Sequence, residues 1–415
     1  MLKASKKRVF LIYIFALFFI YFNYTSYPQF VNKITKEQVM IVPFGATVGI
    51  ALSLLFPFQK INKKSFILSF IMLANVLISA IVNNSFYSEN NMLITAIFIA
   101  FIVSNVVTKE EFINCYINLI VFFAVYSLIT TYVFMPWQLN GVLKVFPTYG
   151  NDIKSYIDTY FSMALFTHGI GRNCGFAREP GVYQIFLTIG IFLSIEYKEA
   201  TYKNLFKTII LMITLLTTFS AVGYVSLVIS IIMLFKKFSK ASNRLLGIII
   251  IFSVLITVFV ILVNTNPYIA EELERTSDKW GDSTQGSFAV RLSGVTSNAT
   301  LFTEKPLFGY GLVSSWLEII DRFGYVDVTG TTFIGFAAFG IVFGCIIHYL
   351  LWHACRCRSM FNTVVWFLTI LFVTLSQNLI ISHLLWIFLF LPFMKSSEEV
   401  EKEKLIRDSV MLHNC

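Results

Sequence analysis

The segment 172–181 carries the charged residues of this chain whose types and spacing best suit chemistry. It reads Arg-Asn-Cys-Gly-Phe-Ala-Arg-Glu-Pro-Gly, so Arg172 and Arg178 flank a short polar stretch and Glu179 follows the second arginine directly. A guanidinium group is planar, permanently charged and shaped to hold phosphate or carboxylate oxygens. This pattern predicts a site that binds an anion.

Pro180 and Gly181 open a long apolar run, which predicts a helix that begins at this point. The unpaired N–H groups at a helix start carry partial positive charge, and beside two arginines they can hold a pyrophosphate group. In the alternative interpretation, Arg172 and Arg178 only reach toward lipid headgroups at a membrane surface. We favour the anion site and keep the alternative open.

Two side chains near this segment are candidates for accepting a proton. Glu179 could act as a general base, or it could be the structural ion-pair partner of Arg178. His168 is the only histidine in the two long polar loops, 136–180 and 265–332, and it competes equally for the base role. A lone histidine is more often a polar filler, so the sequence leaves the base unassigned.

A second group of candidates lies in the loop 265–332. Arg291 is followed by the segment 304–311, Glu-Lys-Pro-Leu-Phe-Gly-Tyr-Gly, whose proline and glycines predict a tight bend with close backbone approach. Arg275 has acidic residues at helical spacing and is interpreted first as an ion-pair residue. For Arg322, which follows Asp321 directly, an ion pair and a role in anion binding weigh equally.

The elements that must position these residues are apolar enough to lie in a membrane. Of the 415 residues 57% are hydrophobic and 13% are charged, and the mean hydropathy is +0.74, which excludes an ordinary soluble protein. A helix needs about 20 apolar residues to cross the hydrocarbon layer, and about twelve stretches are candidates. They lie near 9–23, 39–57, 66–82, 91–107, 112–135, from 181 onwards, 205–235, 245–264, 333–351 and 361–394, with two crossings in each of the ranges 205–235 and 361–394.

Each of the two ranges that hold two crossings contains a polar break. Residues 205–235 are interrupted at 220–223, and residues 361–394 are interrupted at 376–378.

The predicted fold class is all-α, a polytopic integral membrane protein with about twelve transmembrane helices and two long extracytoplasmic loops. The predicted parts are 1–135 with helices one to five, 136–180 as the first loop, 181–264 with helices six to nine, 265–332 as the large loop with helical stretches near 267–280, 288–302 and 312–323, 333–394 with helices ten to twelve, and the tail 395–415.

Positive charge gathers in the loops on one side of these helices. Twenty-one of the 32 lysine and arginine residues lie near the N-terminus, in alternate short loops and in the tail, so both termini are predicted to be cytoplasmic and the number of spans even. Five of the ten arginines lie instead in the two outer loops, where topology does not require them. The first apolar run lacks a signal-peptide cleavage site, so we expect a retained first span.

The cysteine pattern and the net charge indicate which kinds of site and partner are not expected. The six cysteines are scattered, and no cluster of histidine, cysteine and aspartate has the spacing of a metal site, so neither a disulfide framework nor a bound metal or other cofactor is expected. The net charge of +9 is explained by membrane topology, so no nucleic acid partner is expected either.

Three sequence motifs together resemble the Wzy-type polysaccharide polymerases of the O-antigen ligase and polymerase superfamily. The first is Arg-x-x-Gly-Phe-x-Arg-Glu-Pro-Gly at 172–181, and the second is Thr-Thr-Phe-Ser-Ala-Val-Gly-Tyr at 217–224, similar to the family's Ser-x-x-Gly break between two spans. The third is Arg291 with Pro-Leu-Phe-Gly-Tyr-Gly at 306–311. The resemblance covers about residues 160–340, and the N-terminal spans match only in hydropathy.

The resemblance implies a metal-independent membrane glycosyltransferase in the bacterial cytoplasmic membrane. Such enzymes polymerise undecaprenyl-pyrophosphate-linked repeat units into capsule, O-antigen or exopolysaccharide on the outer face. The residues expected to bind the pyrophosphate are Arg172, Arg178 and Arg291, and Arg275 is ranked after these three. Arg178 and Arg291 are also expected to be catalytic, with Glu179 or His168 as the base. The implied partners are the lipid-linked glycan, membrane lipids, a chain-length regulator and a flippase.

Four alternatives to a polymerase are weighed against the sequence: a ligase, a flippase, an ion-coupled transporter and a structural scaffold. The ligase branch of the superfamily typically carries a catalytic histidine in the large loop, and residues 265–332 contain none, which favours a polymerase. A flippase for lipid-linked oligosaccharides, or an ion-coupled transporter, needs charged residues within the spans, and such residues are nearly absent here. A structural scaffold would not need arginines concentrated in the outer loops.

Overall fold

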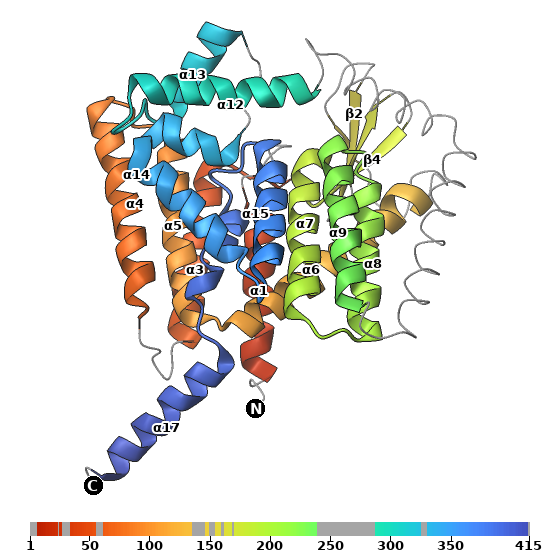
Figure 1. Cartoon of the computed structure of the whole chain (residues 1–415), viewed down its shortest axis with the longest axis vertical. Coiled ribbons are helices and arrows are strands. Elements are labelled where there is room, and N and C mark those ends of the chain that lie inside the picture. Colours follow the sequence, from red (N-terminus) through yellow and green to blue (C-terminus); the bar gives the residue numbers. More distant parts are fainter. Residues whose placement is uncertain are drawn as a thin grey trace.

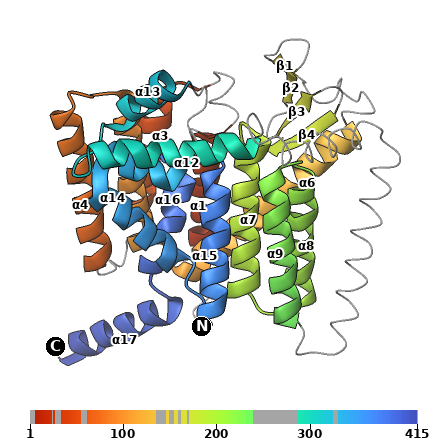
Figure 2. The same cartoon turned by 45° about the horizontal axis from the view of Figure 1, so that its top comes forward.

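The computed structural model describes residues 6–23, 25–26, 34–54, 61–134, 146–148, 154–158, 162–167, 170–238, 287–324 and 330–413. In these parts the chain forms a bundle of helices, with a small sheet and two more helices at one end of the bundle (Figure 1). The first turn of α1 and the last helix, α17, lie at the opposite end, and the turned view gives the same arrangement (Figure 2). The bundle thus has a sheet end and a termini end.

The helices of the bundle run between these two ends. They are α1 (Lys6–Tyr21), α3 (Lys36–Leu54), α4 (Lys63–Val82), α5 (Ser88–Val106), α6 (Lys109–Ile129), α7 (Pro180–Tyr197), α8 (Tyr202–Leu216), α9 (Ala221–Phe238), α14 (Thr331–Ala354), α15 (Met360–Leu375) and α16 (His383–Leu389). Helices α12 (Ser287–Glu304) and α13 (Leu312–Phe323) lie across the sheet end, and α17 (Ser397–His413) extends from the termini end (Figure 1).

Five of the described helices are both long enough and apolar enough to cross a membrane. They are α4, α5, α6 with its continuation to Tyr132, α7 and α14. The helical character is therefore confirmed, and these five helices are candidate membrane spans by length and composition. The count of twelve spans stays a prediction, and the ninth expected span, 245–264, lies outside the described residues.

Each of the two long apolar stretches contains a break, but the first lies at 217–220 and not at the expected 220–223, because residues 221–223 already belong to the next helix. Helix α8 ends at Leu216 and α9 begins at Ala221, and Phe219 between them has a left-handed backbone with φ 48°. Helix α15 ends at Leu375, directly before the expected break at 376–378. In the large loop, α12 and α13 occupy the expected stretches 288–302 and 312–323, whereas 267–280 lies outside the described residues.

Local capping explains where several helices start. The Thr108 side chain accepts a hydrogen bond from the Glu111 backbone, and the Glu111 carboxylate accepts one from the Thr108 backbone, which forms a capping box at the start of α6. The Asn62 side chain accepts from two backbone N–H groups at the start of α4. Pro180 occupies the first turn of α7, as the sequence predicts.

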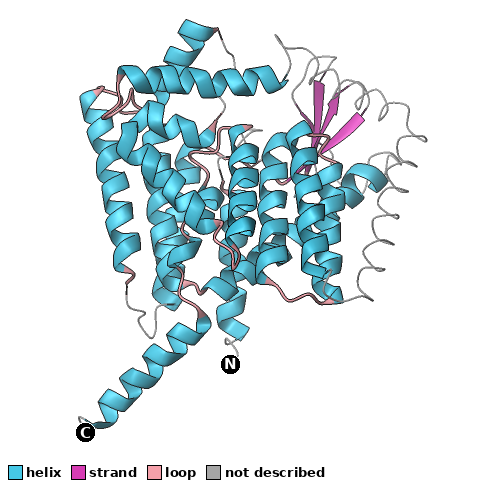
Figure 3. Ribbon diagram, in the orientation of Figure 1, coloured by secondary structure: helices cyan, strands magenta, loops and turns pink. Residues whose placement is uncertain are grey.

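A four-stranded antiparallel sheet lies between α6 and α7 in sequence, and it was not expected from an all-α prediction (Figure 3). Its strands pair in chain order and are β1 (Phe146–Thr148), β2 (Lys154–Asp158), β3 (Met163–Thr167) and β4 (Ile170–Gly175). Helix α6 continues into a π-helical turn, Thr130–Phe134, before this region. The fold is mainly helical as predicted, and the sequence analysis missed only this sheet, because short strands in a polar loop give a weak periodic signal.

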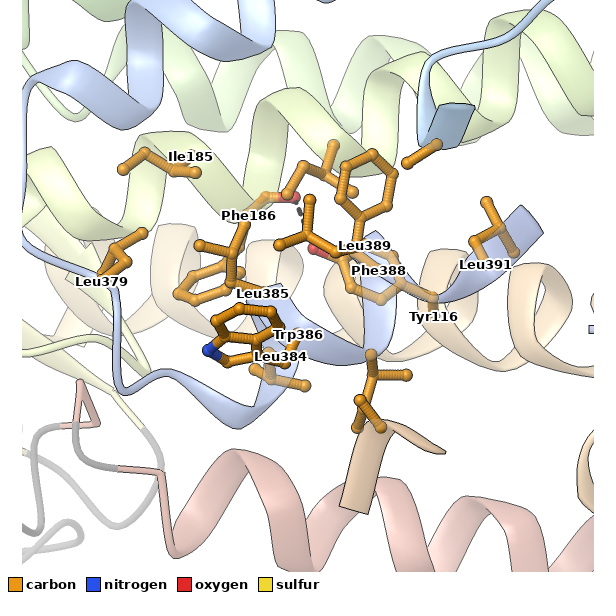
Figure 4. Packing of buried hydrophobic residues seen from close by; sticks show 14 of the residues in the cluster. Tyr116, Ile185, Phe186, Leu379, Leu384, Leu385, Trp386, Phe388, Leu389 and Leu391 are labelled. Carbon is orange, nitrogen blue, oxygen red and sulfur yellow. Dashed lines mark hydrogen bonds between the residues drawn. The ribbon is translucent and has the colours of Figure 1, made fainter. Parts of the chain in front are cut away.

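The core of the bundle surrounds α16, whose seven residues are all buried (Figure 4). Beside it, the Tyr116 hydroxyl of α6 donates a hydrogen bond of 3.1 Å to the Phe186 carbonyl of α7. Helix α16 is too short to cross a hydrocarbon layer of about 30 Å by itself. Because the segment is enclosed by protein, its non-helical flanks can still be accommodated.

Candidate functional site

The first motif, residues 172–181, begins in strand β4, bends at Gly175 and ends in the first turn of α7. Gly175 has φ +52°, and a Cβ at this position would lie 2.2 Å from the ring of Tyr183, which is fully buried. Only glycine accommodates both the left-handed backbone and the close ring. The bend therefore sets where Arg178 and Glu179 stand relative to α7.

Arg178 is held in place through its backbone by the segment that follows α1. Its N–H donates to the Thr25 carbonyl at 2.9 Å, and the neighbouring Ala177 forms a bridge with Ser26. The Arg178 side chain is 21% exposed, and its Nε lies 3.8 Å from a carboxylate oxygen of Glu179. Its guanidinium group thus lies beside the start of a helix, with most of the side chain shielded from solvent.

Glu179 is the N-cap residue of α7, but its side chain makes no capping hydrogen bond. The carboxylate is 36% exposed, and its ion pair with Arg178 is at the long end of the contact range. Both roles considered from sequence, a partner for Arg178 or a base, are therefore compatible with this position.

Arg172 contacts the second motif instead of standing beside Arg178. Its Nε and Nη2 donate to the carbonyls of Thr218 and Phe219, at 3.3 and 2.9 Å. These carbonyls belong to the turn between α8 and α9, where the helical hydrogen bonds end. Arg172 therefore ties the first motif to the second and stabilises the α8–α9 turn.

Asn173 strengthens the same connection, and sequence reasoning passed over it. Its amide is fully buried and donates to the hydroxyls of Ser127 and Thr217, at 3.0 and 3.2 Å, while its oxygen accepts from the Gly175 N–H at 2.9 Å. Its own backbone N–H donates to the Thr217 carbonyl. The signal in the sequence was a polar residue two positions before a glycine, which is typical of an Asx turn.

The third motif, 306–311, lies against a break in α14. Gly340 inside that helix has φ 81° and ψ −170°, and the segment fills the gap. Ile341 donates to the Pro306 carbonyl at 2.8 Å, and the N–H groups of Tyr310 and Gly311 donate to the carbonyls of Ala337 and Ala338. The expected tight bend with close backbone approach is confirmed, and its observed role is to replace helical hydrogen bonds in α14.

The connection between α12 and α13 is held by charged side chains. Arg322 binds both carboxylate oxygens of Glu304, at 2.9 and 2.7 Å, and its Nε lies 2.6 Å from Glu318. The Tyr310 hydroxyl also donates to Glu304, and the Lys305 ammonium lies 4.0 Å from the Tyr310 ring centre. The ion-pair interpretation of Arg322 is supported, with Glu304 and Glu318 as partners in place of the expected Asp321.

This cluster gives a pH-dependent prediction. The hydrogen bond from Tyr310, followed by the hydrogen bond from Arg322, holds the pKa of Glu304 below its ordinary value of 4.5. The ionised carboxylate therefore stabilises the folded protein above pH 4.5, and this contribution to folding stability is lost as the pH falls through the lowered pKa. Arg322→Gln should lower the unfolding temperature at pH 7 by no more than about 2 °C, because the pair is exposed. Thermal unfolding of both proteins across pH would show this difference vanish well below pH 4.5. Arg358→Gln, at the termini end, is the control; a difference that persists in acid would exclude Glu304 as the partner.

Arg291 belongs to α12, and its side chain lies outside the described residues. The C-terminal end of α12 is anchored near α4, because the neighbouring Lys305 ammonium donates to the Asn83 side chain at 3.2 Å. From there α12 runs across the sheet end, and both views show its far end on the side of α7 (Figures 1 and 2). Thirteen helical residues span about 20 Å, so Arg291 is carried well away from Glu304, in the direction of α7.

The other predicted site residues cannot be placed. His168 and Arg275 lie outside the described residues. Within the part of the chain that the structure describes, no three histidine, cysteine, aspartate or glutamate residues are grouped so that they could hold a metal ion. The site that can be built is therefore Arg178 and Glu179 at the start of α7, with Arg172 and Asn173 supporting them.

No protein-family model, no curated protein and no solved structure matches this chain.

Proposed function

We propose that this chain is a membrane glycosyltransferase that polymerises undecaprenyl-pyrophosphate-linked oligosaccharide repeat units on the outer face of the bacterial cytoplasmic membrane. The observation that supports it most is the position of Arg178, whose mostly buried side chain lies beside the N-terminus of α7 and next to the carboxylate of Glu179. A cation, a positive helix end and a carboxylate at one place suit a reaction in which a pyrophosphate leaves and a hydroxyl loses a proton.

The proposed reaction balances as a single transfer. The hydroxyl oxygen of the acceptor sugar attacks the anomeric carbon of the donor glycan, and the bond from that carbon to the pyrophosphate oxygen breaks. The electron pair leaves with undecaprenyl pyrophosphate, whose growing negative charge Arg178 and Arg291 stabilise. The acceptor proton passes to a base, for which Glu179 is the described candidate and His168 the other.

The distribution of positive charge also suggests how the chain is oriented in the membrane. About twelve spans would place both termini in the cytoplasm and the sheet end outside the membrane. The basic termini end supports this orientation, since α6, the tail and the N-terminus meet there: Lys109 donates its N–H to the Lys395 carbonyl, and Arg8 pairs with Glu111 at 2.6 Å. A ligase would use the same leaving group but a different acceptor, and a flippase would make no new bond.

The test is polymer length on a gel, from a strain that lacks the chain's gene and carries wild type, Arg178→Ala, Arg291→Ala or Arg358→Ala. Loss of one stabilising donor typically slows such a step by about 100-fold or more, so the first two variants should yield only single lipid-linked repeats. Arg358, exposed at the termini end, is the control and should leave polymer unchanged. Membrane abundance of each variant is measured alongside.

Two outcomes would overturn the proposal. Normal polymer from both Arg178→Ala and Arg291→Ala would remove the arginine site. Single repeats that never reach the outer surface, as judged by lectin binding to whole cells, would instead indicate a flippase. Arg178→Lys separates charge from shape, because lysine keeps the charge but loses the planar fork that binds two oxygens.

A further inference from the structure

Helices α6 and α8 are neighbours, and at the termini end two lysines contact α6: Lys198, which directly follows α7, and Lys207 in α8. The Lys198 ammonium donates to the Asn114 side chain, and the Lys207 ammonium donates to the Asn118 side chain. The two asparagines are one helical turn apart on α6, so the two cations approach the same strip of that helix. We call Lys198, Lys207, Asn114 and Asn118 the lysine patch.

No carboxylate neutralises the lysine patch by direct contact among the described residues. Burial, and then the charge of Lys207, lowers the pKa of Lys198, while the charge of Glu110 acts in the opposite sense. The Glu110 carboxylate is itself engaged by the backbone N–H and the hydroxyl of Ser397, both at 2.9 Å. Two ammonium groups are thus held close together with their repulsion only partly offset.

The surface above the patch is apolar and faces outward. Along α6 the outward strip that contains Asn114 and Asn118 continues with Phe122, Val125 and Ile129, which are 49%, 37% and 40% exposed. These positions recur at helical spacing, so they form one continuous stripe. A chain that crosses a membrane presents such a stripe to acyl chains.

The first turns of α8 flank the patch with aromatic rings. Tyr202 and Phe206 are 75% and 65% exposed and lie one turn apart. Exposed aromatic rings next to lysines are typical of the level where lipid headgroups meet the hydrocarbon layer. The cations and the exposed aromatic rings therefore lie together at the end of the apolar stripe nearest the termini.

We propose that the lysine patch binds the phosphate of an anionic phospholipid, such as phosphatidylglycerol, whose acyl chains lie along the α6 stripe. A free phosphate would use the cations but not the stripe, and a neutral lipid would leave the two charges uncompensated. Basic pockets between helices on the cytoplasmic side are suited to such headgroups. This inference does not depend on the proposed function.

The test is the binding of phosphatidylglycerol to the purified full chain in phosphatidylcholine nanodiscs, measured by native mass spectrometry. The Lys198→Gln/Lys207→Gln variant should bind phosphatidylglycerol about 30-fold more weakly than wild type. The matched control is Lys63→Gln/Lys64→Gln, which removes the same charge from exposed positions at the start of α4, at the same end, and should bind as wild type. Thermal unfolding in pure phosphatidylcholine checks that each variant is folded.

Three results would overturn the proposal. Equal binding by wild type and Lys198→Gln/Lys207→Gln would show that the patch does not recognise the lipid. An equal loss in Lys63→Gln/Lys64→Gln would mean that only overall charge matters. Displacement of the lipid by inorganic phosphate at a comparable concentration would show that the site takes a free anion. If the variant unfolds, Lys207→Arg, which keeps the charge, should retain binding in the same assay.

Discussion

Gly340→Ala should abolish most of the folded protein. A Cβ at Gly340 would lie 2.2 Å from the Leu307 carbonyl oxygen, against backbone that cannot move aside, and φ 81° with ψ −170° is a conformation that only glycine adopts readily. Backbone strain and overpacking together should cost about 3–5 kcal/mol, a large part of the stability of a typical protein. The yield of monodisperse protein after size exclusion, followed by thermal unfolding, measures the effect.

Two other glycines serve as controls for this substitution. Gly324 also has a positive φ, +68°, but nothing lies within 4 Å of its missing Cβ, so Gly324→Ala should show backbone strain alone, about 1 kcal/mol. Gly45 lies inside α3 with open space around it, and Gly45→Ala should be neutral or slightly stabilising. Behaviour of Gly340→Ala like that of Gly45→Ala would mean that the segment 306–311 does not fill a break in α14.

The Gly340 experiment also bears on the proposed site. The segment 306–311 fixes the C-terminal end of α12 to α14 and α4, and α12 carries Arg291 toward α7. If that connection is released by Gly309→Ala, whose Cβ would lie 2.3 Å from the Ala338 backbone, Arg291 should lose its position as well. Under the proposed function, any surviving protein should behave like Arg291→Ala and yield mainly single lipid-linked repeats.

Asn173→Leu should be the second most damaging substitution. It keeps the size of the side chain but removes the acceptor for the buried Gly175 N–H and the donor to the Ser127 and Thr217 hydroxyls, which keep their bonds to backbone carbonyls. Buried polar groups that lose a hydrogen bond cost about 1–3 kcal/mol each, and partial compensation should leave a total near 2–4 kcal/mol. Thermal unfolding in detergent, with membrane abundance, measures this loss.

The control for Asn173→Leu is Asn91→Leu, at an exposed position of α5. Because that side chain is in contact with the surroundings of the bundle, its replacement should change stability by no more than about 0.5 kcal/mol. If Asn173→Leu is as stable as Asn91→Leu, the buried amide does not hold the first motif to the α8–α9 turn. Arg172→Ala should then also be tolerated, since both residues act on the same turn.

The sequence by itself determined the helices and the breaks between them. Apolar runs of 15 to 24 residues must form helices, because only an internally bonded backbone is stable in a hydrocarbon layer. Pro180 and Ser376 mark helix ends as predicted, whereas the break between α8 and α9 falls at 217–220, three positions before the predicted 220–223. The helical stretch 312–323 and the tight bend after Pro306 followed from the same local rules.

The tertiary structure alone decided which polar residues meet. Arg172 and Arg178 look equivalent in sequence, yet the first binds carbonyls of the α8–α9 turn and the second stands beside the start of α7. Arg322 pairs with Glu304, eighteen positions away, in preference to the adjacent Asp321. Such choices depend on how helices pack and where their unpaired backbone groups end up, and these are distances that no local pattern encodes.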